Sequence, residues 1–312
     1  MTFCYSFFSF NVIILIEGDN VQEYGEVENN VDLKIYNTYK IGGRAKYLVK
    51  PYDKNKLLLL LKYLRSNNIK YFIIGKGSNI ILPDENYDGV IILLNNLNNI
   101  DIKDNIVYAE AGIPLTILVQ NLVNNNLGGL ENLSGIPGTL GGAIVQNAGC
   151  YNTLISDYLE EVTCIINNEI KTIKKEECNF LYRDSIFKYN KNMIIIGAKF
   201  KLINDDKERM LSIIKENIQK RKNSQPLMYP NAGSVFRNPS NISAGKLIED
   251  ALLKGYHING AYVSTKHANF IINKDNATSE DIINLINYIK KEIKNKYNID
   301  LILEQEIIKY SE

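Results

Sequence analysis

Residues 71–79 read "YFIIGKGSN", in which aromatic and β-branched residues lead into a polar loop with two glycines. The apolar run favours a β-strand. Glycines permit positive φ, so successive N–H groups can point into one concavity that suits an anion. Neither the Walker pattern nor a G-x-G-x-x-G opening a helix fits. The loop therefore predicts either a plain turn or a phosphate site made of Gly75, Lys76, Gly77, Ser78 and Asn79.

A second glycine-rich stretch, "SGIPGTLGGAIVQNAG", occupies residues 134–149. Such glycine density weakens any helix or strand. Close passage beside a large planar or phosphorylated ligand would explain it, and so would a tight chain crossing under the core. Because one glycine loop follows each of two α+β units, the pair suggests a long ligand lying between them.

The composition favours a soluble enzyme or binding protein with small-molecule partners. The chain has 312 residues, enough for two or three packed units. Its 36 basic and 35 acidic residues leave a net charge of +1. The chain therefore has no overall positive potential that would attract nucleic acid or an anionic membrane. Four cysteines without C-x-x-C spacing and two histidines predict free thiols in a reducing cytoplasm and no metal site.

The N-terminus is apolar but unlike a membrane anchor. Its first charged residue is Glu17, and the preceding run is shorter than the ~20 residues that cross a bilayer. It has no basic segment and no small-residue cleavage site of a signal peptide. We expect residues 1–30 to be an apolar leader that packs on the body or reflects a misjudged gene start, without stable membrane insertion.

Periodicity predicts an α+β protein of three units after this leader. Residues 31–95 carry an amphipathic helix at 53–67 and strands at 70–74 and 89–94. Residues 96–225 carry short strands that suggest a mixed sheet, and a helix that begins at Pro114. Residues 226–312 carry helices at 243–253 and 279–297, the latter opened by Thr278-x-x-Asp281, and a final strand at 300–308.

Eight motifs in this order resemble those of the UDP-N-acetylenolpyruvoylglucosamine reductase family. They are IGGRA (41–45), GKGSN (75–79), AGIPL (111–115), SGIPGTLGGAIVQNAG (134–149), YRDSIFK (182–188), NAGSVFRNP (231–239), AGKLIEDALLKG (244–255) and LEQE (303–306). The resemblance covers about residues 31–309. It implies the FAD-binding fold of the vanillyl-alcohol-oxidase/PCMH type, in two subdomains at 31–95 and 96–225, and a C-terminal α+β substrate-binding domain at 226–312.

The same resemblance implies a cytoplasmic flavoenzyme of peptidoglycan precursor synthesis. Its NADPH-dependent reaction reduces UDP-N-acetylglucosamine enolpyruvate to UDP-N-acetylmuramate. FAD would be noncovalent, since neither glycine loop contains a histidine for a tether. The implied FAD-binding residues are Gly42, Gly75, Lys76, Gly77, Ser78, Asn79, Gly112, Ser134, Gly135, Ile136, Pro137, Gly138, Gly141, Gly142 and Asn147.

Three residues match the family's catalytic positions. Arg183 would hold the substrate carboxylate, because a guanidinium gives a planar two-point contact, although an Arg-Asp pair is also a common structural salt bridge. Ser234 would donate a proton, although a serine after Ala-Gly is most often a turn residue. Period-2 alternation turns Glu304 and Glu306 to one face. A solvated strand face would explain that pair, whereas the family motif makes the second, Glu306, catalytic.

Substrate contacts follow from the resemblance at Tyr182, Arg237, Asn238 and His267. The chain has no room between "GAKFKL" and Pro226 for an extra tyrosine-bearing loop, which indicates the shorter type of the family. "NAGCYNT", residues 147–153, departs from the usual small residue followed by Tyr-Gly. An oxidase of the same flavin fold and a non-catalytic nucleotide-binding protein remain alternatives, and the preference for NADPH over NADH stays open.

Overall fold

The first sheet contains the strand that leads into the first glycine loop. The computed structural model describes residues 21–239 and 242–310. Its strands β1 (Gly25–Asp32), β2 (Arg44–Pro51), β5 (Tyr87–Leu93) and β3 (Tyr71–Ile74) lie in the order β1-β2-β5-β3. β2 and β3 both run parallel to β5, and helix α1 (Lys54–Ser66) provides the crossover that joins them. Four leucines of α1 are buried against the core.

Strand β1 begins inside the segment that was predicted to be an apolar leader. Residues 25–29 and 31–32 pair with β2 as an antiparallel edge strand, so the first sheet begins before residue 31 and this part of the predicted leader packs on the body. The strand reads "GEVENNVD" and buries only Gly25 and Val31. An edge strand with mostly polar residues shows no alternation that a sequence pattern would reveal. Residues 1–20 lie outside the described residues.

The second sheet is antiparallel throughout, which corrects the expected mixed sheet. Its order is β12 (Glu169–Lys174), β11 (Leu159–Ile166), β13 (Ile194–Lys201), β7 (Ile106–Glu110) and β6 (Ile100–Lys103). The same part of the chain contains helices α2 (Leu115–Asn124) and α3 (Leu140–Val145). Pro114 is the residue before α2 rather than its first helical residue, with φ −61° and ψ 134°.

Shorter elements complete this part of the chain. They are the 3₁₀ helices η1 (Val21–Glu23), η2 (Leu33–Tyr36), η3 (Glu131–Leu133), η4 (Lys175–Cys178) and η5 (Ile186–Lys188), and the short strands β4 (Ile80–Ile81), β8 (Leu127–Gly128), β9 (Gly149–Cys150), β10 (Thr153–Leu154) and β14 (Ile203–Asn204).

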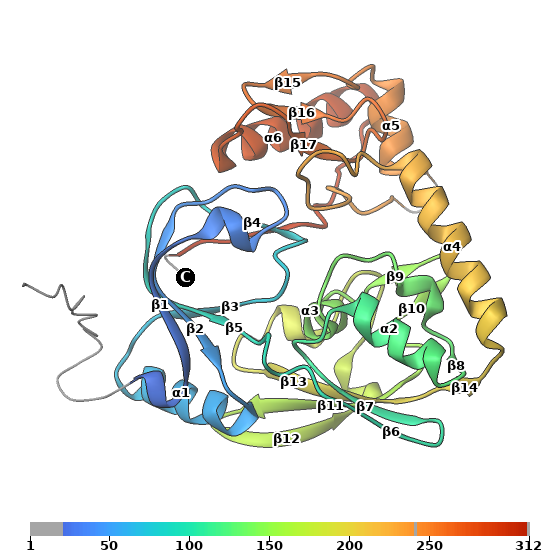
Figure 1. Ribbon diagram of the computed structural model, residues 1–312. Helices are drawn as coiled ribbons and strands as arrows, with labels where there is room; N and C mark the ends of the chain where they lie inside the picture. Colours follow the sequence, from blue (N-terminus) through green and yellow to red (C-terminus); the bar gives the residue numbers. More distant parts are fainter. Residues whose placement is uncertain (1–20, 240–241, 311–312) are drawn as a thin grey trace, which may run out of the picture.

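The C-terminal unit stands apart from the two sheets and is reached along one helix. α4 (Lys207–Ser224) runs from the second sheet up to this unit (Figure 1). There β15 (His257–Ile258), β16 (Ala261–Val263) and β17 (Ile271–Asn273) form an antiparallel sheet with α5 (Ala244–Asp250) and α6 (Ser279–Tyr297). The capping box predicted at Thr278 and Asp281 is confirmed, since each side chain accepts the other's backbone N–H.

The predicted final strand at 300–308 is wrong as a continuous strand. Leu303 forms an isolated bridge with Phe236, the chain bends at Gln305, and only β18 (Glu306–Ile307) pairs, in parallel, with β4. Gln305 is buried and donates its amide to the carbonyls of Ala232 and Gly233, at 3.1 and 3.3 Å. The segment bends because it joins two different units in succession.

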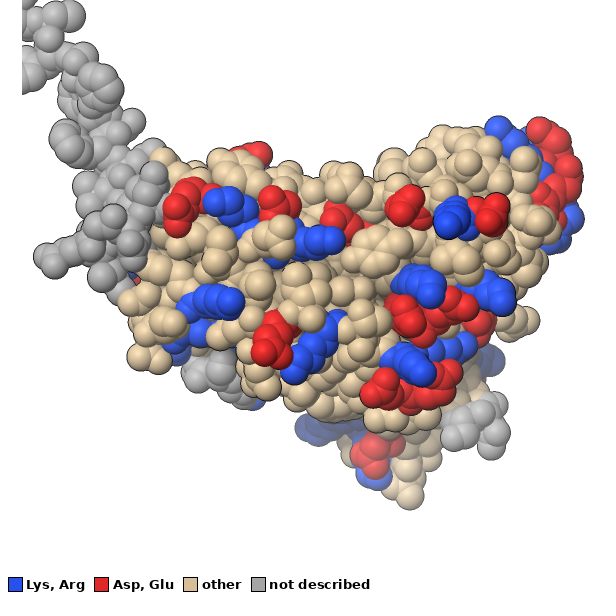
Figure 2. Space-filling model, turned by 90° about the horizontal axis from the view of Figure 1, so that it is seen from below, with Lys and Arg blue, Asp and Glu red and all other residues tan. Residues whose placement is uncertain are grey.

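Charges on the surface are mixed in sign. On the face seen from below, basic and acidic side chains are interspersed (Figure 2). Within residues 21–239 and 242–310, no helix combines the length and apolarity of a membrane span. The same part of the chain contains no cluster of three His, Cys, Asp or Glu side chains suited to a metal ion.

Candidate functional site

One large cavity of about 1230 Å³ lies where the units meet. Its wall comes from both glycine loops, the segment around Arg183, the end of α4, the loop with Ser234, and the last segment of the chain. Pockets for drug-sized ligands measure about 300–1,000 Å³, so this one suits a larger molecule. A second cavity of about 500 Å³ near Phe180 and Leu181 contains none of the predicted site residues.

The first glycine loop is held close to its neighbours. Gly77 has φ +60°, and a Cβ there would overlap the backbone of Tyr36 and Asn37. A Cβ on Gly75 would lie 2.6 Å from the Thr139 hydroxyl. The two glycine loops therefore touch each other, and residues 75–79 all contribute to the cavity wall.

The second glycine loop presents open backbone to the cavity. Thr139 caps α3 by accepting the N–H of Gly142 at 3.4 Å. A Cβ on Gly138 would come only within 3.8 Å of Ser78 Oγ, and one on Gly142 within 3.5 Å of Thr139 Oγ1. A side chain at either position would project into space that backbone alone leaves free. The buried amide oxygens of Gln146 and Gln225 also lack a hydrogen bond from the described residues. This cradle fits the expected FAD.

Four of the residues predicted to bind FAD are absent from the cavity wall: Gly42, Ser134, Gly135 and Asn147. Gly42, with φ +113°, packs between Leu82 and Leu33, and Gly135 lies under the Arg221 side chain. Asn147 is buried and donates to the carbonyl of Leu181 at 2.9 Å. Ser134 is likewise buried and absent from the wall. Gly112 does line the cavity, together with Ile136, Pro137 and Gly141, but its lack of a side chain chiefly avoids the Leu94 carbonyl.

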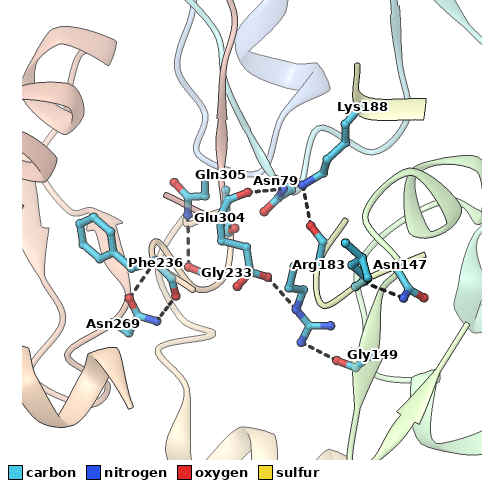
Figure 3. A network of polar contacts seen from close by, with 12 residues as sticks. Asn79, Asn147, Gly149, Arg183, Lys188, Gly233, Phe236, Asn269, Glu304 and Gln305 are labelled. Carbon is cyan, nitrogen blue, oxygen red and sulfur yellow. Dashed lines mark hydrogen bonds and ion pairs between the residues drawn. The ribbon is translucent and has the colours of Figure 1, made fainter. Parts of the chain in front are cut away.

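Arg183 is fixed in a tight turn on the cavity wall. Its φ is +56°, and Leu181 and Asp184 exchange backbone hydrogen bonds around it. The guanidinium Nη2 donates to the Gly149 carbonyl at 2.7 Å, and Nε lies 3.1 Å from Glu304 Oε1 in an ion pair (Figure 3). Lys188 Nζ donates to the Arg183 carbonyl at 2.8 Å. Two segments distant in sequence, around Gly149 and Glu304, thus converge on one arginine.

Ser234 lies on the same wall, half-buried, in a loop that its neighbours hold in place. Val235 N donates to the Asn269 carbonyl at 2.9 Å, and the Asn269 side chain makes two hydrogen bonds with the backbone of Phe236. Gly233 precedes the serine with φ +76°, and its Cβ position meets no described atom within 4 Å. The loop therefore fixes the backbone on both sides of Ser234 while leaving its surroundings open.

Both glutamates of the last segment line the cavity. A solvated strand face is ruled out for Glu304, whose side chain is 17% exposed. Burial raises the pKa of Glu304, and the charges of Arg183 and Lys188 oppose that rise. Glu306 keeps an exposed side chain, and the protein around it raises its pKa by desolvation, opposed by the charges of Lys188 and Lys191. Both carboxyls therefore hold a proton more readily than freely solvated glutamates do.

The predicted substrate residues lie outside the cavity wall. Tyr182 is exposed, with the Arg183 guanidinium 5.4 Å from its ring centre. Arg237 Nη1 is 3.9 Å from Asp184 Oδ2, and Asn238 accepts the first backbone N–H of α5. His267 accepts the N–H of Asn269 through Nδ1 at 3.3 Å, and burial lowers its pKa.

Several wall residues were not predicted from the sequence. Among them are Lys188, Lys191, Arg221, Gln225, Met228 and Glu304. Lys188 is the last residue of the YRDSIFK motif, so the motif could have indicated it as a site residue. Arg221 lies in the last turn of α4, and Gln225 follows the helix as its extended C-cap, so helical spacing does not predict that both line one wall. Met228 is 90% exposed, in a proline-rich connection that shows no periodicity.

Comparisons with known proteins agree with this arrangement. Residues 225–308 match a family model described as UDP-N-acetylenolpyruvoylglucosamine reductase, C-terminal domain, and residues 45–169 match one described as FAD binding domain. The reductase of that name from Clostridium novyi is 39% identical over 291 residues, covering 93% of this chain and 94% of the relative. The one from Caldanaerobacter subterraneus is 42% identical over 285 residues, covering 91% and 94%.

A solved structure extends the comparison to the fold. The crystal structure of the UDP-N-acetylenolpyruvylglucosamine reductase of Thermus caldophilus superposes with a TM-score of 0.78 at 31% identity. The superposition covers 92% of this chain and 100% of the Thermus caldophilus chain. The predicted FAD-binding fold with a C-terminal α+β domain is thereby confirmed. The chain belongs to the UDP-N-acetylenolpyruvoylglucosamine reductase family.

Proposed function

We propose that this protein reduces UDP-N-acetylglucosamine enolpyruvate to UDP-N-acetylmuramate, an NADPH-dependent step of peptidoglycan precursor synthesis with FAD as cofactor. One observation carries the proposal. Arg183, Ser234 and Glu306 come from three separate segments, yet all face the single cavity that the two glycine loops line.

The reacting group is an enol ether conjugated with a carboxylate, and the reaction needs a hydride at its terminal carbon and a proton at the adjacent carbon. FAD, when bound, supplies the two-electron carrier between NADPH and this double bond. Arg183 binds the substrate carboxylate, where negative charge builds up during the reaction. Ser234 supplies the proton. Glu306, with its raised pKa, acts beside it as an acid or as an orienting group.

The placement of the cofactor rests on the two glycine loops. Residues 75–79 would hold its diphosphate, and Gly138 and Gly142 would lie against its flat part. We further propose that residues 31–95 and 96–225 form two FAD-binding subdomains and residues 226–312 the substrate-binding domain, with the protein working in the cytoplasm.

We place the protein in the shorter type of its family. Between Lys201 and Pro226 the described chain forms only β14 and α4, without an inserted loop. Tyr182, Arg237, Asn238 and His267 then contact the sugar nucleotide beyond the cavity wall. Arg237 provides a cation suited to the diphosphate.

A spectroscopic experiment tests the function. We expect the purified protein to be yellow, to bleach on anaerobic addition of NADPH, and to recover its colour when the enolpyruvyl substrate is added, with UDP-N-acetylmuramate formed in equal amount. Recovery of colour with oxygen but not with the substrate would indicate an oxidase instead. Absence of bound flavin would indicate a nucleotide-binding protein without this activity.

A further inference from the structure

Glu304 is the carboxylate nearest to Arg183, although the motif comparison gives a role only to Glu306. Its Oε1 lies 3.1 Å from Arg183 Nε (Figure 3). The side chains of the pair are 17% and 21% exposed, so water screens them less than a surface ion pair. Glu306, by contrast, has no ion pair with any described residue. The two neighbouring glutamates therefore occupy different electrostatic positions on one wall.

The backbone of Glu304 is held from both sides of the cavity. Its N–H donates to the Val235 carbonyl at 2.8 Å, one residue beyond Ser234. Its carbonyl accepts from Asn79 Nδ2 of the first glycine loop at 3.1 Å. The next residue, Gln305, is buried and accepts from the Tyr39 hydroxyl at 3.0 Å. Glu304 is therefore fixed by contacts that do not involve Arg183.

Arg183 needs such a fixed partner. Its side chain is long and loses considerable rotamer entropy when it is held in one geometry. The Gly149 carbonyl accepts a hydrogen bond from Nη2, and Glu304 lies beside Nε in an ion pair without an aligned hydrogen bond. The bond to Gly149 uses one of the five N–H groups of the guanidinium, and a carboxylate approaching from the cavity can accept from others.

From this geometry we propose that Glu304 is a positioning residue that sets the orientation in which Arg183 receives the substrate carboxylate. The proposal rests on the proposed function, because it gives Arg183 the same task. It separates the two glutamates: Glu304 acts through Arg183, and Glu306 acts at the proton transfer.

A double-mutant cycle tests this role. The four proteins are the wild type, Glu304→Gln, Arg183→Lys and the double variant, all as holoenzymes. Glutamine keeps the size of the side chain and removes its charge. Two quantities are measured in each protein: the dissociation constant of the enolpyruvyl substrate from the change in flavin spectrum, and the rate at which substrate reoxidises the NADPH-reduced protein.

In the arginine background, we expect Glu304→Gln to weaken substrate binding or slow reoxidation by about tenfold, within the range for contacting residues. In the Arg183→Lys background, the same change should have an effect of less than about threefold, because its partner is already lost. Flavin content and the rate of reduction by NADPH should be unchanged. Glu160→Gln is the matched control, since Glu160 pairs with Lys199 at 3.2 Å, neither residue lines the cavity, and the change should alter neither quantity.

Two results would overturn the inference. One is an equal effect of Glu304→Gln in both backgrounds. The other is a loss of flavin or of NADPH reduction as large as the loss in the substrate step, which would mark Glu304 as a general structural residue. If wild-type protein is not reoxidised by the substrate at all, the proposed function fails rather than this inference.

Discussion

At the level of single residues, the glycines of the two loops serve two different purposes. Gly77 and Gly75 are glycines because a side chain would collide with neighbouring protein. Gly138 and Gly142 have room for a Cβ, whose nearest neighbours would lie 3.8 and 3.5 Å away. Composition reveals the density of glycine but not this division, because the division depends on what the fold places beside each one.

The two kinds of glycine should respond differently to substitution. Gly138→Val should leave the unfolding free energy of the FAD-free protein nearly unchanged but weaken FAD binding, because the side chain occupies the cavity. Gly77→Val should lower both, since it forces a β-branched residue to φ +60° against the Tyr36 backbone. Urea unfolding and FAD titration measure the two effects. Wild-type affinity for FAD in Gly138→Val would place the cofactor elsewhere.

Ser234→Ala should separate the two halves of the reaction. The serine lies on the cavity wall, and no described residue hydrogen-bonds its hydroxyl, so its removal should leave the site intact. Reduction by NADPH should stay fast. Reoxidation by the enolpyruvyl substrate should slow by at least about 100-fold, the lower contribution of a positioned general acid. Stopped-flow traces in which both steps slow equally would contradict the assignment.

The pH dependence of the substrate step should report Glu306. Desolvation by the surrounding protein raises its pKa, so the acid form persists to higher pH than in a freely solvated glutamate, and the rate should fall as pH rises through that pKa. Glu306→Gln should abolish this fall. Lys188→Met removes the larger opposing charge and should therefore move the fall to higher pH, with Lys191→Met giving a smaller shift. Movement to lower pH in Lys188→Met would contradict the assignment.

At the level of elements, local signals predicted helices well and strands less well. The predicted helix at 279–297 is confirmed as α6, because a capping box marks its start and apolar periodicity its length. The helix predicted at 53–67 is found at Lys54–Ser66. β1 was not predicted because this edge strand buries few of its residues and shows no apolar alternation. The last segment was predicted as one strand because its alternation is regular, but its backbone partners come from separate units and bend it.

The cap of α6 should contribute measurably to stability. Thr278→Ala removes the acceptor for the Asp281 N–H, at 3.1 Å, and should lower the free energy of unfolding by about 0.5–2 kcal/mol. Chemical denaturation followed by circular dichroism measures the change, and flavin content should be retained. Thr116→Ala, at an exposed position in α2, is the matched control and should leave stability unchanged or slightly raised. Equal losses in both variants would show that the cap contributes nothing specific.

At the level of the whole molecule, the site is assembled from parts that no local pattern connects. Asn79, Arg183, Ser234 and Glu304 are far apart in sequence and meet through the last segment of the chain. The motifs identified Arg183, Ser234 and Glu306 one by one through resemblance. They did not reveal that Glu304 contacts Arg183, since an ion pair between distant segments depends on the tertiary fold.

The shared cavity also bears on the order of events. Both glycine loops, Arg183 and Ser234 line one space of about 1230 Å³, and the cavity near Phe180 and Leu181 contains none of these residues. NADPH must therefore leave before the sugar nucleotide can approach the same cofactor. Steady-state rates at varied concentrations of both substrates should give parallel double-reciprocal lines, and each substrate at high concentration should inhibit competitively against the other. Intersecting lines would require both substrates to be bound together, and would mean that the C-terminal unit opens a second route to the cofactor.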